Sequence, residues 1–499
     1  MKKSILSIYL TATIIFAISG NIRTYAQHTP QKSAQETVEE LINAKTTEQA
    51  VVSICAITGE GRKIVDINSS QMLVPASNMK LISTGAALHK FGPDHRYETA
   101  IAHDGRIVDG TLEGNIYILG GGDPTLGSID SIATPITKTF AQWTDIIKSA
   151  GIKRINGRII GDGRYFDSGI EEPTWLAEDI GTYYGAGTTG LMFYENMQSF
   201  NVSAGRAIGD SINISPSYPE VPWMEFRYNC TTGEKGTGDR LFMFTSDLAP
   251  IAEIRGTFGV DRKPKRLDCS NKFPEYTCAY YFGEYLKSCG ISSCGVGDFR
   301  LDRSWTPNGE LAVLGKTYSP KLSSIIFETN HISNNVFAET LLRSLGKDLT
   351  GSASYDSSYV AIYKVMSELK VDTSRGCRIK DGSGLSRQNY ISSDFLCRFL
   401  KGMMDSQYFA EFAQSLPSPG KNGTLLYNMK KSPEALKTRI KVKSGSMNGV
   451  RCYSGYIIPT EGAREDVIIF SIMINNCTSP TWEVRKVLDS IMAELAQLN

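Results

Sequence analysis

Three short motifs carry side chains that could catalyse acyl transfer, and the first pairs Ser77 with Lys80. Two residues three apart at the start of a helix lie on one face, within reach of each other. A lysine amine takes the serine proton only when it is neutral, and burial or a neighbouring cation lowers its pKa toward that state. A helix-capping serine followed by a solvated lysine has the same pattern. Pro75-Ala76 before the pair and an apolar helix after it favour the catalytic interpretation.

The second motif is Ser333-Asn334-Asn335. A hydroxyl such as that of Ser333 can relay a proton to a departing amine. The amide of Asn335 can hold both a lysine and a substrate backbone. A helix cap would use the same residue types equally well.

The third motif is Lys443-Ser444-Gly445-Ser446, on a predicted strand that leads into a turn at 448–449. A lysine there can attract a carboxylate, and the hydroxyl of Ser446 can bond to it. Gly445 allows another backbone to approach closely. An ordinary strand edge with an exposed lysine is the alternative.

The N-terminus predicts export. Lys2 and Lys3 precede a mostly apolar run over 5–18, and Thr24-Tyr25-Ala26 is a plausible cleavage site before Gln27. The run is too short to span a membrane, so residues 1–26 are predicted to be a signal peptide. We therefore expect a protein of the periplasm or cell envelope, soluble or in peripheral contact with the membrane.

Charge and cysteine content argue against nucleic-acid binding and against a metal site. The chain has 53 Lys+Arg against 52 Asp+Glu, which leaves no basic field to bind nucleic acid. All ten cysteines follow the signal peptide, in a compartment that permits disulfides. Four of them lie close together and favour local bridges: Cys269, Cys278, Cys289 and Cys294. No cysteine or histidine spacing indicates a metal site.

Hydrophobic periodicity predicts helices and strands at both ends of the chain. The predicted strands cover 50–57, 63–67, 438–444, 450–458 and 466–474, and the last is fully apolar, typical of a buried central strand. The predicted helices cover 37–44, 75–90, 320–346, 356–369, 393–405 and 481–497. We expect 27–96 and 311–499 to form one discontinuous α/β domain, with 97–310 as an inserted, mainly β domain in one or two subdomains.

The order and spacing of the three motifs resemble a known family. S-x-x-K, S-x-N and K-T-G follow in this order in the D-Ala-D-Ala carboxypeptidase/endopeptidase family of low-molecular-mass (class C) penicillin-binding proteins. The gap of about 250 residues between Lys80 and Ser333 leaves room for an inserted domain. Further similar segments are PASNMKLIST around Ser77, GGGDPTL at 120–126, SNNVFAETLLRSLG at 333–346, DGSGLSRQN at 381–389 and the Gly-Thr-Leu run at 423–425. The family usually has Lys-Thr-Gly where this chain has Lys443-Ser444-Gly445, which keeps the hydroxyl and loses a methyl group.

The resemblance implies a fold and a chemistry. The fold is β-lactamase/transpeptidase-like, an antiparallel sheet flanked by helices. Ser77 would attack the carbonyl between two D-alanines, with Lys80 as general base. Ser333 would pass a proton to the leaving D-amino acid, and Asn335 would hold Lys80 and the acyl chain.

The resemblance also assigns the third motif to substrate binding. Lys443 would keep Lys80 neutral by repulsion and, with Ser446, would bind the terminal carboxylate. Ser444 and Gly445 complete this motif. The backbone N–H groups of Ser77 and Ser446 would form an oxyanion hole. No cofactor is needed, the substrates would be peptidoglycan stem peptides, and β-lactams would be inhibitors.

Two other functions remain open from the sequence. A β-lactamase or esterase could use the same fold, but it needs a group that activates water in the acyl-enzyme, and none is evident. A catalytically silent peptidoglycan-binding protein would not need all three motifs intact.

Overall fold

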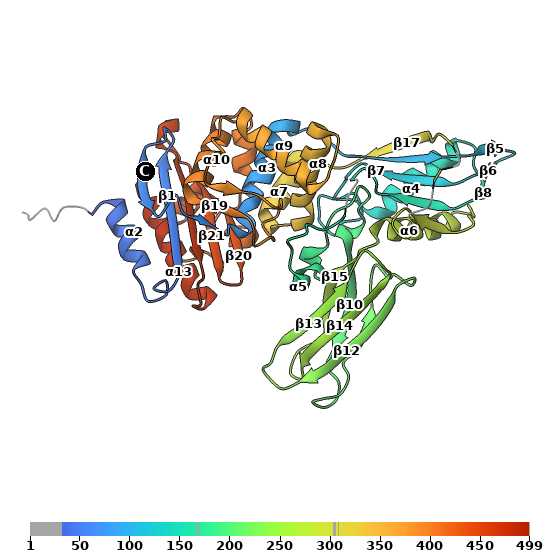
Figure 1. Cartoon of the computed structure of the whole chain (residues 1–499), viewed down its shortest axis with the longest axis horizontal. Coiled ribbons are helices and arrows are strands. Elements are labelled where there is room, and N and C mark those ends of the chain that lie inside the picture. The colour runs from blue at the N-terminus through green and yellow to red at the C-terminus, as the bar shows by residue number, and fades with distance from the viewer. Residues whose placement is uncertain (1–31, 167–168, 303–305, 308, 499) are drawn as a thin grey trace, which may run out of the picture.

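The structure, a computed structural model, describes residues 32–166, 169–302, 306–307 and 309–498. The predicted signal peptide, 1–26, lies outside the described residues. Figure 1 shows three parts: a body that contains both ends of the described chain, an α/β unit that extends from it, and a β unit that branches off. In the described part of the chain, no helix has the length and apolarity needed to cross a membrane.

The body is built on a five-stranded sheet in the order β2-β1-β22-β21-β20, and every neighbouring pair is antiparallel. The strands are β1 (Val51–Thr58), β2 (Lys63–Ile67), β20 (Ile440–Met447), β21 (Val450–Ile457) and β22 (Ile468–Asn475). All eight residues of β22 are buried, and this strand pairs with β1 on one side and β21 on the other. The prediction of a buried central strand is therefore confirmed.

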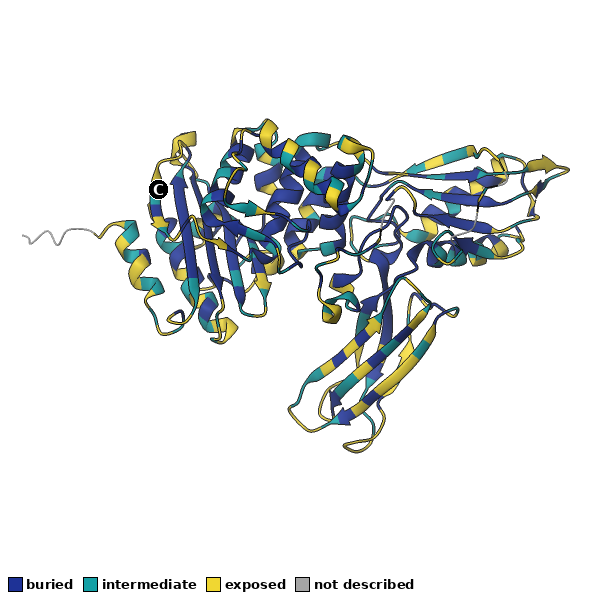
Figure 2. Cartoon of the chain, viewed as in Figure 1, coloured by how far each residue is buried: buried dark blue, intermediate teal, exposed yellow. Residues whose placement is uncertain are grey.

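Helices cover both faces of this sheet (Figure 1). One face packs on α2 (Ala34–Ile42) and α13 (Thr481–Leu495). The other face packs on a helical layer made of α3 (Met79–Phe91), α7 (Leu322–Ile332), α8 (Asn335–Thr350), α9 (Tyr355–Glu368), α10 (Ser393–Asp405) and α11 (Phe409–Gln414). Figure 2 shows that the sheet and the inner faces of these helices are buried. This is the predicted α/β arrangement of an antiparallel sheet between helices.

Short elements complete the body. They are β3 (Met72–Leu73), η1 (Ala76–Asn78), β18 (Cys377–Arg378), β19 (Tyr390–Ser392), η4 (Gly423–Leu425), α12 (Glu434–Arg439) and η5 (Arg464–Asp466). The sheet β18-β19-β3 brings the chain just after the 381–389 loop next to the chain just before Ser77. The helical stretch predicted over 320–346 is two helices, because Ser333 has φ 64° and ends α7 in the left-handed region.

The inserted segment contains two separate hydrophobic cores. The α/β unit has the sheet β16-β9-β7-β4-β17 and the small sheet β5-β6-β8. Its elements are β4 (Glu98–His103), β5 (Arg106–Val108), β6 (Thr111–Glu113), β7 (Ile116–Gly120), α4 (Ile136–Ser149), β8 (Arg154–Ile155), β9 (Ile159–Asp162), α6 (Pro274–Ser288), β16 (Val296–Asp298) and β17 (Ala312–Tyr318). The two helices α4 and α6 pack on this sheet, although the sequence indicated mainly strands.

The β unit has two three-stranded sheets, β11-β10-β15 and β12-β14-β13. Its strands are β10 (Met197–Ser203), β11 (Asn213–Pro216), β12 (Glu225–Gly233), β13 (Asp239–Thr245), β14 (Ile251–Gly259) and β15 (Lys265–Ser270). Three short helical turns lie between the β unit and the body: α5 (Ala177–Ile180), η2 (Tyr183–Gly185) and η3 (Tyr194–Asn196).

One boundary differs from the predicted one. We placed the return to the first domain at residue 311, but β17 pairs with β4 over Ala312–Tyr318 and so belongs to the sheet of the α/β unit. The sequence could not show this, because the partner strand lies more than 200 residues earlier in the chain. We still propose that the two ends of the chain form one domain and that the segment between them is an insertion.

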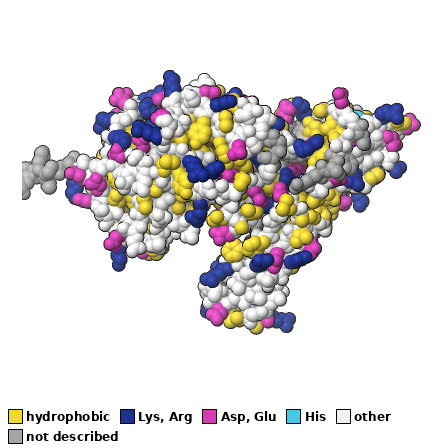
Figure 3. Space-filling model, viewed as in Figure 1, with side chains coloured by type: hydrophobic (Ala, Val, Ile, Leu, Met, Phe, Trp, Pro, Cys, Tyr) yellow, Lys and Arg dark blue, Asp and Glu magenta, His cyan; other side chains and the backbone are white. Residues whose placement is uncertain are grey.

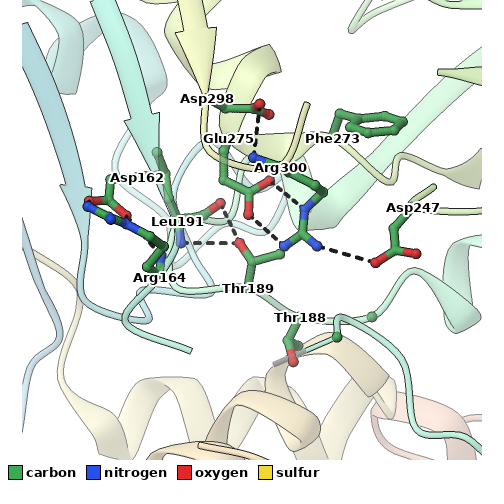
Figure 4. Close-up of polar contacts among 12 residues, drawn as sticks. Asp162, Arg164, Thr188, Thr189, Leu191, Asp247, Phe273, Glu275, Asp298 and Arg300 are labelled. Atoms are coloured by element: carbon green, nitrogen blue, oxygen red, sulfur yellow. Dashed lines mark hydrogen bonds and ion pairs between the residues drawn. The ribbon is translucent and has the colours of Figure 1, made fainter. Parts of the chain in front are cut away.

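Arg300 joins the two inserted units (Figure 4). Its guanidinium donates to the Glu275 carboxylate of α6 at 2.9 Å and lies 3.4 Å from Asp247, in the loop after β13. The Arg300 backbone N–H donates to Asp298 at 3.1 Å. Burial and the neighbouring Glu275 raise the pKa of Asp298 to about 7. A charge network therefore connects the two hydrophobic cores.

The predicted local disulfides do not form. All ten cysteines are unpaired. Cys269 lies in the core of the β unit and Cys278 points from α6 into the core of the α/β unit, so neighbours in sequence are held in different cores. Closeness along the chain therefore did not indicate closeness in space.

Candidate active site

Ser77 lies in η1, directly before the N-terminus of α3. The side chain of Lys80 turns back along the helix, and its Nζ lies 3.1 Å from Ser77 Oγ. Ala76 has φ 45°, a left-handed conformation that is costly for a residue with a Cβ. The backbone just before the serine is therefore held in a strained turn at the positive end of a helix.

Lys80 is completely buried and surrounded by acceptors. Besides Ser77, its Nζ donates to Asn335 Oδ1 at 2.6 Å and to the Ser383 carbonyl at 2.7 Å. Burial lowers the pKa of Lys80 to about 7, although Asp381 and Glu339 act in the opposite direction. A large share of the amine is therefore neutral at neutral pH, as a general base requires.

The loop 381–385 was recognised in the sequence only as a similar segment, and its part in the site was missed. Glu339, buried in α8, accepts hydrogen bonds from the backbone N–H groups of Gly382 and Ser383. Asp381 accepts from the N–H of Gly384 at 2.7 Å. These bonds hold the Ser383 carbonyl against Lys80. Burial, with repulsion from Asp381, raises the pKa of Glu339 to about 8.

Gly384 is the point where this loop touches the nucleophile turn. Its φ is 86°, and a Cβ there would lie 1.9 Å from the Ala76 carbonyl oxygen. Only glycine fits such a position without displacing backbone. The loop and the turn that carries Ser77 therefore support each other.

Ser333 and Lys443 meet across the site from Ser77. Lys443 Nζ donates to Ser333 Oγ at 2.9 Å and to the Ser444 carbonyl at 2.8 Å. The side chain of Lys443 is completely buried, and burial lowers its pKa well below the usual range, with repulsion from Lys80 adding to this. The left-handed turn at Ser333 directs the hydroxyl away from α8 and toward Lys443.

Strand β20 brings the third motif next to Ser77. A Cβ on Gly445 would lie 2.7 Å from the Pro75 carbonyl oxygen, so the strand passes directly over the turn before Ser77. Ser444 Oγ is hydrogen-bonded at 2.7 Å to Thr424 Oγ1, which belongs to the Gly-Thr-Leu run that the sequence showed only as a similar segment. Ser446 is exposed. The structure thus brings together all eight residues predicted from the three motifs, on three separate segments of the body.

The inserted segment completes the site. Asn335 Nδ2 donates to the Tyr184 carbonyl at 2.8 Å, and Asn334 Nδ2 donates to Glu195 at 2.7 Å. Tyr184 and Glu195 were both missed by sequence reasoning, since nothing local distinguishes them. The second motif is therefore fixed by the insertion on one side and by Lys80 on the other.

A cavity of about 580 Å³ opens at Ser77 between the body and the insertion. Five carboxylates and one arginine line it: Asp130, Glu178, Asp179, Glu195, Asp268 and Arg387. On the molecular face seen in Figure 3, by contrast, basic and acidic side chains are interspersed without a large field of one sign. Burial raises the pKa of Asp130 to about 8, so the negative charge of the cavity comes from the other four carboxylates, which outnumber its arginine and favour a cationic group on the ligand.

An antiparallel sheet covered by helices, with a serine at a helix start beside a buried lysine whose pKa is about 7, defines a class of acyl-transferring serine hydrolases. Comparison with known proteins narrows this class. A family model described as the D-Ala-D-Ala carboxypeptidase 3 (S13) family matches residues 34–497. This chain belongs to that family, and it is a peptidase of the serine type.

Individual relatives agree with this assignment. A D-alanyl-D-alanine carboxypeptidase of Actinomadura sp. (strain R39) is 27% identical over 478 residues, which cover 93% of this chain and 84% of that protein. D-alanyl-D-alanine carboxypeptidase DacB of Haemophilus influenzae is 22% identical over 422 residues, 82% of each chain. The crystal structure of penicillin binding protein 4 from Haemophilus influenzae has the same fold, with a TM-score of 0.77 at 21% identity, over 93% of this chain and 98% of that one. The predicted family and fold class are confirmed.

Proposed function

We propose that this protein hydrolyses D-alanyl-D-alanine bonds of peptidoglycan stem peptides through an acyl-enzyme on Ser77. The observation that carries the proposal is the contact of 3.1 Å between Ser77 Oγ and a buried lysine whose pKa is about 7. The names of the relatives support the same activity. Export by the N-terminal segment would deliver the enzyme to its substrate.

Acylation begins when Ser77 Oγ attacks the carbonyl carbon and Lys80 takes its proton. The N–H groups of Ser77 and Ser446 stabilise the charge on the carbonyl oxygen. As the C–N bond breaks, the Ser333 hydroxyl gives a proton to the departing amine. Lys443, which lies 2.9 Å from Ser333 Oγ, replaces that proton.

Deacylation reverses these transfers. Water attacks the ester carbonyl, and Lys80 returns its proton to Ser77 Oγ. The proton lost by water goes back through Ser333 to Lys443. Both lysines regain their starting states, and the acid and the D-amino acid are released.

Substrate binding follows the charges of the site. The terminal carboxylate bonds to Ser446 and Ser444 and stabilises the ammonium form of Lys443, whose pKa burial otherwise lowers. The carboxylates that line the 580 Å³ cavity attract the free amino group of a stem-peptide diamino acid. The same site acts as an endopeptidase when the leaving D-amino acid belongs to a second stem peptide.

Intact mass after incubation with a penicillin tests the proposal. The wild type gains the mass of the intact drug, because a β-lactam acylates the same serine, and Ser77→Ala gains nothing. Ser367→Ala, an exposed position on α9, is the matched control and gains the same mass as the wild type.

The lifetime of the adduct also distinguishes a peptidase from a β-lactamase. An adduct that persists for minutes supports the peptidase, and one that clears within seconds favours a β-lactamase. A folded wild type without any adduct would overturn the proposal and favour a silent peptidoglycan-binding protein.

A further inference from the structure

A second cavity, of about 280 Å³, opens on the other side of Ser77. It shares Ser77, Ser333 and Ser446 with the 580 Å³ cavity and continues past Ser444 toward α13. Its far wall includes Arg451 of β21 and Arg485 of α13. The nucleophile therefore lies between two cavities, with the Lys443–Ser446 strand bordering the second one.

The two cavities have opposite charge. Arg451 and Arg485 are the charged residues among the described residues that line the smaller cavity, and no carboxylate lines it. Five carboxylates and a single arginine line the larger one. A substrate that crosses Ser77 therefore passes from a negative to a positive environment.

The two arginines differ in how they are held. Arg451 donates to the carbonyls of Met447 and Val450 and to the Thr481 hydroxyl, so it is fixed in place. Arg485 is half-buried on α13, and the Asp489 carboxylate, one turn further along the same helix, lies close enough to attract it electrostatically. The hydrogen bonds of Asp489 come from Asn428 and from the Met429 N–H, and not from Arg485. Within the described residues the Arg485 guanidinium makes no hydrogen bond or salt bridge, and it lies half-buried at the wall of a cavity that reaches Ser77.

We propose that this cavity binds the leaving group and that Arg485 selects leaving D-amino acids with a second carboxylate beyond the α-carboxylate. The proposal rests on the function proposed above. Lys443 and Ser446 hold the α-carboxylate, and the hydroxyls of Ser444 and Thr424 line the path from there to Arg485. D-Alanine has no group that reaches this wall, whereas the acidic leaving strand of a peptide cross-link does. Arg485 would therefore favour cleavage of cross-links over removal of a terminal D-alanine.

Three synthetic N-acylated peptides that end in D-Ala-D-Ala, D-Ala-D-Glu and D-Ala-D-Gln test the preference with the mature enzyme. D-Glu and D-Gln have nearly the same shape and differ in charge. We expect the wild type to have a kcat/KM about tenfold higher for the D-Glu peptide than for the D-Gln peptide, equivalent to roughly 1.4 kcal/mol. Arg485→Gln should bring this ratio close to one, and Arg485→Lys should retain part of it.

Lys486→Gln is the matched control, because Lys486 is exposed next to Arg485 and stacks on Trp482 at the surface. This variant should keep the tenfold ratio. A wild-type ratio near one, or a ratio in Arg485→Gln equal to that of the wild type while D-Ala-D-Ala is still cleaved, would overturn the inference. If no peptide is cleaved and no penicillin adduct forms on the wild type, the proposed function itself fails, and the leaving-group subsite with it.

Discussion

Burial lowers the pKa of Lys80, the residue that the proposed mechanism uses as the general base for Ser77. The amine is completely enclosed, and its three hydrogen-bond partners come from η1, α8 and the 381–385 loop. Repulsion from Lys443 was expected to keep Lys80 neutral. In the structure, desolvation is the main cause of the lowered pKa of Lys80, and repulsion between the two lysines acts on Lys443.

The pH dependence of acylation should follow Lys80. Its pKa is about 7, so the neutral base is lost as the pH falls below this value. We expect the second-order rate of penicillin acylation to rise about tenfold per pH unit below pH 7 and to level off above it. Stopped-flow measurement between pH 5.5 and 9 checks this.

Lys80→Arg tests whether acylation needs a neutral base at this position. Arginine remains protonated at every pH in that range. Acylation should slow by about 10²- to 10⁴-fold, the usual contribution of a general base. Lys90→Arg, on the same helix but paired with Asp348 at the surface, should acylate like the wild type. A flat wild-type pH profile would contradict this role of Lys80.

At the scale of elements, the 381–385 loop and η1 are held together by backbone contact at Gly384. Gly384→Ala should displace the turn that carries Ser77, since the new Cβ would overlap the Ala76 carbonyl. We expect penicillin acylation to fall at least tenfold and the melting temperature to decrease.

Gly351→Ala is the matched control for this contact. Gly351 has φ 81°, close to the 86° of Gly384, but has open space around it. Gly351→Ala should lower the free energy of unfolding only by the strain of an alanine in the left-handed region, about 1 kcal/mol, and should leave the rate of penicillin acylation unchanged. Equal losses in both variants would mean that backbone strain, and not the contact with Ala76, is the cause.

At the scale of the whole molecule, Arg300 is the charged link between the two inserted units. Arg300→Met would leave Glu275 buried without its cation, which costs about 3 kcal/mol or more in the free energy of unfolding. Arg255→Met removes a solvent-screened pair with Glu253 and should lower the free energy of unfolding far less than Arg300→Met does. Urea unfolding of the two variants measures the difference, and similar losses would show that the Arg300 network does not stabilise the insertion.

Much of the body could be predicted because its hydrophobic pattern is regular. The helix 393–405 has the predicted bounds, and the strands predicted over 438–474 form the observed sheet. The secondary structure of the insertion was harder to predict from the sequence. Its helix α4 has Ile136, Phe140, Trp143 and Ile147 at helical spacing, but its aromatic and β-branched residues are also typical of strands.

The sequence by itself determined the family and the antiparallel sheet between helices, and it predicted the eight motif residues, because local periodicity and motif order are carried by residues close together in the chain. Only the tertiary structure decided which groups surround them. The Ser383 carbonyl, Tyr184, Thr424 and Arg485 reach the site through contacts between distant segments, and no local pattern encodes such contacts. The break at Ser333, the pairing of β17 with β4 and the separation of the cysteines were decided in the same way.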